Sequence, residues 1–203
     1  MDQNTLNKGL NTLSQLDSDL KKALAIHGKP DPRDRPQGFE TFLSTIISQQ
    51  ISTSAATAIT ARVRRLMPEC SAASLQKISD IELRQAGLSS RKIEYARGLA
   101  EAILAGRFNP ESLSTVDDEE AISQITSLRG FGQWSAEIYL MFSLGRTDIF
   151  PADDLALQVA LGRLKGLKER PTASLARQLV SHWSPWRSAG AIFLWHYYKE
   201  TPD

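Results

Sequence analysis

The chain has 203 residues, 41% hydrophobic and 23% charged, and its single cysteine excludes an intramolecular disulfide, a four-cysteine zinc site and an iron–sulfur cluster. Its 24 Lys and Arg residues are balanced by 23 Asp and Glu residues, and a net charge of +1 is not that of a typical nucleic-acid-binding protein. No apolar run reaches the length of about 18 residues that a membrane span needs, and the polar N-terminus is unlike a signal peptide, so a cytoplasmic protein is expected.

Helical periodicity begins near the N-terminus. Leucines recur at helical spacing and predict a helix over 10–26 that ends before Gly28. These leucines are Leu10, Leu13, Leu16, Leu20 and Leu24. The proline-rich residues 28–38 predict a loop, and the apolar pattern of 39–50 predicts the next helix.

Further helices are predicted along the rest of the chain. Residues 55–66 and 91–105 carry amphipathic patterns, and acidic residues at 117–120 mark another helix start. The predicted caps are Ser52, Thr53 or Ser54 for the first of these helices and Ser89 or Ser90 for the second. No alternating pattern exceeds about four residues, so the sequence predicts an all-α protein of around ten helices.

A Gly-x-Gly turn between two predicted helices stands out at Gly130 and Gly132. Glycines permit a positive φ and let a phosphate approach the backbone, and the next helix presents its free N–H groups and positive dipole end at the same point. Such a turn can bind a DNA phosphate through main-chain donors, even in a nearly neutral protein. The alternative is an ordinary turn between helices.

The surrounding segments together resemble the helix-hairpin-helix DNA glycosylases, most closely the 3-methyladenine DNA glycosylase II branch. The matching segments, in the family's order, are GFETFLSTIISQQIS, GLSSRKIEYARGLA, the hairpin 128–136, DIFPADDLAL and WSPWRSAGAIFLW. The resemblance implies a two-lobed all-α fold with a cleft between the lobes. The larger relatives carry an N-terminal β-rich domain, which we expect to be absent here because only about 38 residues precede Phe39. The lobes would be residues 39–125 and residues 1–38 plus 146–203, with the hairpin and its following helix at 126–145.

Asp154 matches the catalytic aspartate of this family. Base excision passes through an oxocarbenium-like sugar, which a nearby carboxylate stabilises while it orients the attacking water. We expect Asp154 in the first turn of the helix over 155–164 and Asp153 as its cap. The alternative is that both acids serve only the helix end.

Aromatic residues match the base pocket of the family. Trp134 stands where bifunctional relatives such as endonuclease III carry a Schiff-base lysine, which implies a monofunctional enzyme that leaves an abasic site. Trp195, His196 and Tyr139 are further pocket candidates, with His196 a departure from the branch. An indole face attracts a cationic alkylated base by about 0.5–2 kcal/mol. Alternatively, the tryptophans are core residues.

The family also implies DNA-binding and cation-binding positions. Gln49, Gln50 and Ile51 match the loop that fills the gap left by a flipped nucleotide. Gln50 is polar, so it could plug and hydrogen-bond rather than wedge, and Gln49 could instead hold the loop structurally. The hairpin residues expected at DNA are Arg129, Gly130, Phe131, Gly132, Trp134 and Ser135. The backbone carbonyls of Thr126, Leu128 and Phe131 match those that bind a monovalent cation, Na⁺ or K⁺.

The function implied is excision of alkylated purines, of the 3-methyladenine and 7-methylguanine type, from double-stranded DNA by a monomer without a required cofactor. Two alternatives stay open. The same fold could remove other lesions, namely hypoxanthine, ethenoadenine or 1-methyladenine. It could also be a non-catalytic DNA-binding module, although such a module would not need Asp154. A local basic rim is expected from Arg91, Lys92, Arg97, Lys165, Lys168 and Arg170.

Overall fold

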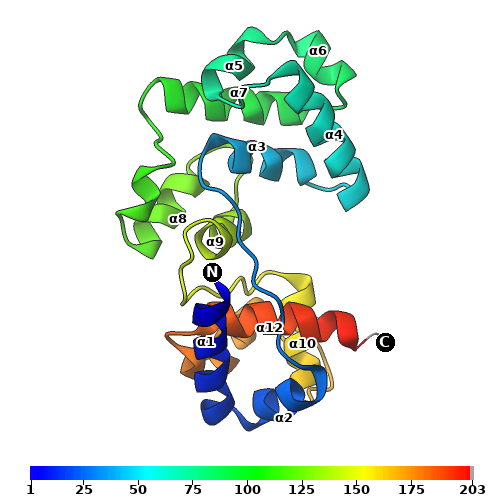
Figure 1. The fold of residues 1–203 in the computed structure, drawn as a ribbon, viewed down its shortest axis with the longest axis vertical. Helices are drawn as coiled ribbons and strands as arrows, with labels where there is room; N and C mark the ends of the chain where they lie inside the picture. The colour runs from blue at the N-terminus through cyan, green and yellow to red at the C-terminus, as the bar shows by residue number, and fades with distance from the viewer. Residues whose placement is uncertain (202–203) are drawn as a thin grey trace. The chain divides into compact units, whose positions relative to one another are not determined.

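A computed structural model describes residues 1–201 of the protein (Figure 1). Within this range every regular element is a helix and no strand occurs, which confirms the all-α prediction. Over the same residues, no helix is long and apolar enough to cross a membrane. The chain forms two compact units. We call Met1–Asp34 together with the chain from Glu137 onward the terminal unit, and Arg35–Ala136 the central unit. The predicted cleft between two lobes stays a prediction.

The terminal unit joins the two ends of the chain in one core. It contains α1 (Gln3–Leu16), α2 (Ser18–His27), α10 (Leu155–Leu164), α11 (Ala173–Leu179), the 3₁₀ turn η2 (Ser181–Trp183) and α12 (Arg187–Glu200). Helix α12 packs against both α10 and α1. Close approach of α1 and α12 requires a glycine, because a Cβ atom on Gly9 would lie 2.7 Å from that of Ala189.

The single helix predicted over residues 10–26 is wrong, because Asp17 divides it into α1 and α2. The backbone of Asp17 is extended, and its side chain accepts hydrogen bonds from the N–H groups of Asp19 and Leu20 at 3.1 and 3.2 Å. Asp17 therefore caps α2, a local bond that competes with continuation of the helix. The leucine pattern runs through the break, so periodicity alone did not show it.

The carboxylate of Asp17 is also the centre of a buried polar network. Its side chain is 1% exposed and accepts hydrogen bonds from Lys165 Nζ at 2.7 and 2.9 Å and from Trp183 Nε1 at 2.8 Å. Burial by itself would raise the pKa of Asp17, but these hydrogen bonds outweigh it and lower the pKa to about 2. The network ties α10 and η2 to the junction of α1 and α2, so Lys165 has a structural partner and is not a free member of a basic rim.

The central unit is organised around α7 (Ser90–Leu104). The other elements are α3 (Phe39–Ser48), α4 (Thr53–Leu66), α5 (Ala72–Lys77), α6 (Asp80–Gln85), η1 (Ser112–Ser114) and α8 (Asp118–Thr126). Helices α3, α5 and α6 all pack against α7. Of the predicted caps, Ser52 accepts the N–H of Ala55 and Ser89 accepts that of Lys92, both at 3.3 Å.

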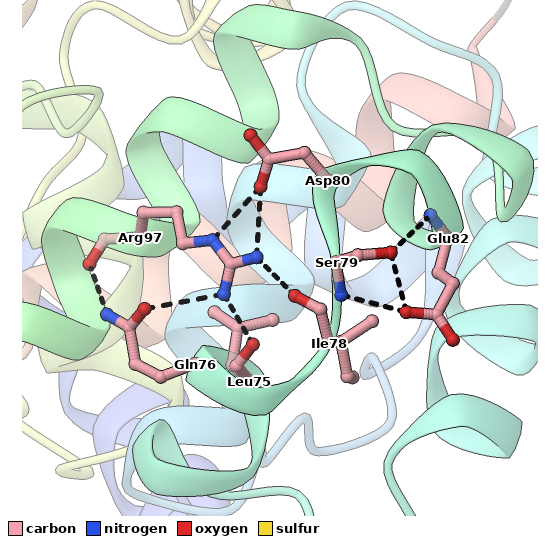
Figure 2. Close-up of polar contacts among 7 residues, drawn as sticks. All are labelled: Leu75, Gln76, Ile78, Ser79, Asp80, Glu82 and Arg97. Carbon is pink, nitrogen blue, oxygen red and sulfur yellow. Dashed lines mark hydrogen bonds and ion pairs between the residues drawn. The ribbon is translucent and has the colours of Figure 1, made fainter.

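Arg97 of α7 fastens the connection between α5 and α6 (Figure 2). Its guanidinium donates to the carbonyl oxygens of Leu75 and Ile78 at the end of α5 and to the Asp80 carboxylate at 2.9 Å. Ser79 beside them forms a capping box with Glu82. Arg97 therefore satisfies the exposed carbonyls of a helix end and, like Lys165, is engaged within the protein rather than in a basic rim.

Candidate DNA-binding and catalytic sites

The predicted hairpin lies between α8 and α9 (Gln133–Phe142). The N–H of Phe131 donates to the Leu128 carbonyl at 3.1 Å and closes the turn, and the Gly132 carbonyl accepts the N–H of Ala136 at 3.1 Å and begins α9. The first turn of α9 belongs to the central unit, which ends at Ala136. The first amides of a helix have no partner inside that helix, so this end of α9 suits an anion.

The two hairpin glycines have different roles. Gly130 has a φ of 98°, and a Cβ atom there would lie 2.6 Å from Cγ of Tyr95. Gly132 is not among the glycines with a positive φ, and a Cβ atom there would meet nothing within 4 Å. Of the two glycines, only Gly130 uses the positive φ that a glycine permits. Gly130 is required by the fold, whereas Gly132 leaves open space above the turn.

A matched pair of substitutions separates these two roles. Gly130→Ala is expected to lower the free energy of unfolding by about 1–3 kcal/mol, because the alanine meets both a strained φ and the Tyr95 ring. Gly132→Ala is expected to leave stability within about 0.5 kcal/mol, as is usual for an open surface position. Urea unfolding of both variants measures the difference. Equal destabilisation would contradict the assignment.

The side chain of Phe131 lies in the core of the central unit. It is 6% exposed and meets the Phe42 ring edge-on with centroids 5.4 Å apart, while Phe42 meets Phe108 in the same way at 5.3 Å. Any contact of Phe131 with DNA therefore has to come from its main chain. Arg129 forms an ion pair with Glu94 of α7, so its guanidinium already has a carboxylate partner.

The plug loop, which we define as residues 49–51, follows α3. Gln49 Nε2 donates a hydrogen bond to the Gly130 carbonyl at 2.8 Å, so the structure gives Gln49 a structural contact, while a contact with DNA stays a prediction. Gln50 is exposed and has a φ of 56°, an uncommon conformation for a residue other than glycine. Ile51 is 36% exposed. Gln50 and Ile51 thus stand at the surface, beside the residue that anchors the loop.

Trp134 and Ser135 lie in the first turn of α9. Trp134 is 42% exposed, which is high for so large an apolar side chain, and Ser135 is half-buried. Packing in the core does not account for an indole that is exposed to this extent. The exposure therefore argues against the alternative that Trp134 is an ordinary core residue.

Asp154 is the cap of α10, not a residue of its first turn, and the prediction that Asp153 is the cap is wrong. Asp154 Oδ1 accepts the N–H of Leu157 at 3.0 Å and Nε1–H of Trp195 at 3.2 Å. Asp153 is exposed and forms an ion pair with Arg177 at 3.1 Å. The two acids thus have different roles: Asp153 pairs with Arg177 at the surface, whereas Asp154 Oδ1 is held by the N–H groups of Leu157 and Trp195.

The loop that leads to Asp154 is held by the start of α12. Arg187 donates to both carboxylate oxygens of Asp148 at 2.7 and 2.8 Å, and Ile149 N–H donates to Ser188 Oγ at 2.9 Å. Burial raises the pKa of Asp148, but the hydrogen bonds from Arg187 and Ser184 lower it overall. Sequence reasoning assigned no role to Arg187 or Ser188, although both lie in the WSPWRS segment that it singled out.

The three predicted pocket residues of the terminal unit have different surroundings. Trp195 contacts Asp154 and also packs near Phe142, with ring centroids 5.7 Å apart. His196 lies on a different side of α12, with Nε2 2.9 Å from the carbonyl oxygen of His27 at the end of α2. Tyr139 of α9 is 3% exposed. The structure therefore brings Asp154 and Trp195 together and places His196 against α2.

A family model described as HhH-GPD superfamily base excision DNA repair protein matches residues 43–185, a range that holds both the hairpin and Asp154. The chain belongs to this family. It is 30% identical over 190 residues to DNA-3-methyladenine glycosylase 1 of Schizosaccharomyces pombe, covering 90% of this chain and 83% of that protein.

Solved structures agree with this family membership. A DNA-3-methyladenine glycosidase from Bacillus halodurans superposes with a TM-score of 0.85 at 33% identity, covering 94% of this chain and 88% of that one. The Schizosaccharomyces pombe 3-methyladenine DNA glycosylase in complex with abasic DNA gives 0.82 at 29% identity, covering 93% and 95%.

Proposed function

We propose that the protein is a monofunctional DNA glycosylase that hydrolyses the N-glycosidic bond of alkylated purines, of the 3-methyladenine and 7-methylguanine type. The observation that carries the proposal is Asp154, a carboxylate fixed at a helix end by Leu157 and Trp195 in a chain of this repair family. The names of the relatives support the alkylated-base substrate class. We expect the enzyme to act as a monomer in the cytoplasm, on double-stranded DNA.

In the proposed reaction, Asp154 acts on the sugar of the flipped nucleotide. Departure of the base leaves positive charge on the sugar ring, and an ionised carboxylate stabilises that charge and orients the attacking water. The Trp195 N–H and the Leu157 amide hold Asp154 Oδ1, so the carboxylate does not need to reorganise during the reaction. Trp134 has no amine with which to form a Schiff base, so the product is an abasic site in an intact strand.

In the same proposal, the hairpin holds a DNA phosphate through main-chain N–H groups at the start of α9. The open space above Gly132 supports this role, since no Cβ atom blocks the approach. The carbonyl oxygens of Thr126, Leu128 and Phe131 would hold a Na⁺ or K⁺ ion, because backbone carbonyls are hard oxygen ligands. The Leu128 carbonyl also accepts the Phe131 N–H, but a carbonyl oxygen has two lone pairs and could hold both the N–H and the ion. Such an ion would add positive charge to the turn.

The test is release of free base from methylated duplex DNA. We expect 3-methyladenine and 7-methylguanine in the supernatant, with strand breaks only after heat or alkali. Substrates with hypoxanthine, ethenoadenine or 1-methyladenine measure the lesion range. Strand cleavage that borohydride traps as a covalent complex would refute the monofunctional mechanism. Binding without release of any of these bases would favour the non-catalytic module.

The charge balance predicts a shallow salt dependence of DNA binding. With a net charge of +1, and with Arg97 and Lys165 engaged inside the protein, few counterions are released on binding. We expect the slope of log K against log salt to correspond to about two to four neutralised phosphates. Titration of an abasic duplex at several salt concentrations measures the slope, and a value near that for about ten phosphates would contradict main-chain binding.

A further inference from the structure

The plug loop is tied to the rest of the central unit by polar contacts that the proposed chemistry does not use. Gln49 Nε2 donates to the carbonyl of Gly130, which lies 81 residues away in the hairpin. Two residues earlier, near the end of α3, the Ile47 carbonyl accepts a hydrogen bond from Lys92 Nζ of α7 at 2.7 Å. Both donors engage main-chain carbonyl oxygens. The contacts therefore fix the end of α3 and the loop that follows it.

Helix α7 also contacts the hairpin directly. The ring of Tyr95 packs against Gly130, where it leaves no room for a Cβ atom, and Glu94 pairs with Arg129. One stretch of α7, from Lys92 to Tyr95, therefore reaches both the end of α3 and the hairpin. Gln49 completes the connection from the side of the plug loop.

Apolar packing does not fix the plug loop. Gln50 and Ile51 are exposed, and a cavity of about 180 Å³ lies beside the loop. The cavity is lined by Gln49, Gln50, Ser89, Arg91, Lys92, Tyr95 and Gly130. Dispersion and the hydrophobic effect are non-directional, and here they contribute little. The position of the loop relative to the hairpin depends on the hydrogen bonds of Gln49 and Lys92.

We propose that Gln49 and Lys92 are positioning residues that hold the plug loop in register with the hairpin. The inference rests on the proposed function. A hairpin bound to one phosphate sets the position of the duplex, and successive nucleotides of a strand are only about 3.4 Å apart along the helix axis. A loop displaced by that distance would enter the wrong base step. The plug would then not offset the cost of extruding the damaged nucleotide.

The test compares one alkylated base in two settings: fully paired in a duplex, and opposite a gap, where extrusion costs least. Gln49→Ala is expected to slow single-turnover excision about tenfold on the paired substrate, as the loss of a hydrogen bond of about 1.4 kcal/mol implies, and by no more than about twofold opposite the gap. Lys92→Met is expected to show the same pattern, and Lys92→Arg, which keeps a donor, to recover most of the rate. Gln85→Ala, at an exposed position of α6, is the matched control and should equal wild type on both.

Fluorescence of 2-aminopurine next to the lesion provides a readout of stack opening that does not need excision. The Gln49→Ala variant should open the paired stack less than wild type. Equal losses on both substrates, or no loss on the paired one, would overturn the proposal. If wild type opens the stack but releases no base from either substrate, the proposed glycosylase function fails instead, and the fluorescence comparison still decides the role of Gln49.

Discussion

Replacement of Asp154 with asparagine is expected to slow base excision about a thousandfold, in the middle of the range of about 10²–10⁴ for loss of a positioned acid–base group. The amide keeps the size of the side chain and its acceptor oxygen but removes the negative charge that the oxocarbenium-like sugar requires. Asparagine also caps helices as well as aspartate does, so α10 should keep its N-terminus and the variant should keep its thermal stability. Single-turnover release of methylated purine from duplex DNA measures the rate.

The neighbouring acid is the control for this experiment. Asp153→Asn removes one negative charge from the same loop but breaks only an exposed ion pair with Arg177, so we expect an excision rate within about fivefold of wild type. DNA affinity should change little in either variant. A full rate with Asp154→Asn, or an equal loss with Asp153→Asn, would remove Asp154 from the mechanism.

Loss of the Asp17 carboxylate is expected to have the largest effect on stability. Asp17→Ala should lower the free energy of unfolding by about 3–5 kcal/mol, because Lys165 and the indole N–H of Trp183 lose their buried acceptor. Urea unfolding should show a lower midpoint with an unchanged slope. Asp19→Ala is the control: its carboxylate also contacts Lys165, at 3.1 Å, but is 42% exposed, so we expect a cost of about 1 kcal/mol or less.

The same carboxylate predicts a pH dependence of stability. The pKa of Asp17 is about 2 in the folded protein against an ordinary value of 3.8, so the unfolded chain takes up a proton at higher pH than the folded protein does. The contribution of Asp17, about 2 kcal/mol, is therefore complete well above pH 3.8 and is lost as the pH falls toward about 2. Unfolding midpoints of wild type should fall more steeply than those of Asp17→Ala over this interval. Parallel curves would contradict the assignment.

The helices and the hairpin were predictable because they depend on short-range spacing. Apolar residues three and four apart, glycine stops and serine caps predicted α3, α4 and α7 close to their observed bounds. The prediction failed at Asp17, where the leucine spacing continues across a break made by one side chain. It also chose the wrong one of two adjacent acids as the cap of α10: both Asp153 and Asp154 are good caps, and the sequence does not show that Arg177 pairs with one and Trp195 with the other.

By itself, the sequence determined the helical class, the position of the Gly-x-Gly turn and the candidate acids, since each depends on residues within a few positions of one another. Only the tertiary structure decided that Phe131 turns into the core, that Trp195 reaches Asp154 from 41 residues away, and that Gln49 holds Gly130 across 81. Side-chain hydrogen bonds and ring contacts at such separations depend on how helices pack, and hydrophobic periodicity specifies which face of a helix is buried but not which residue it meets.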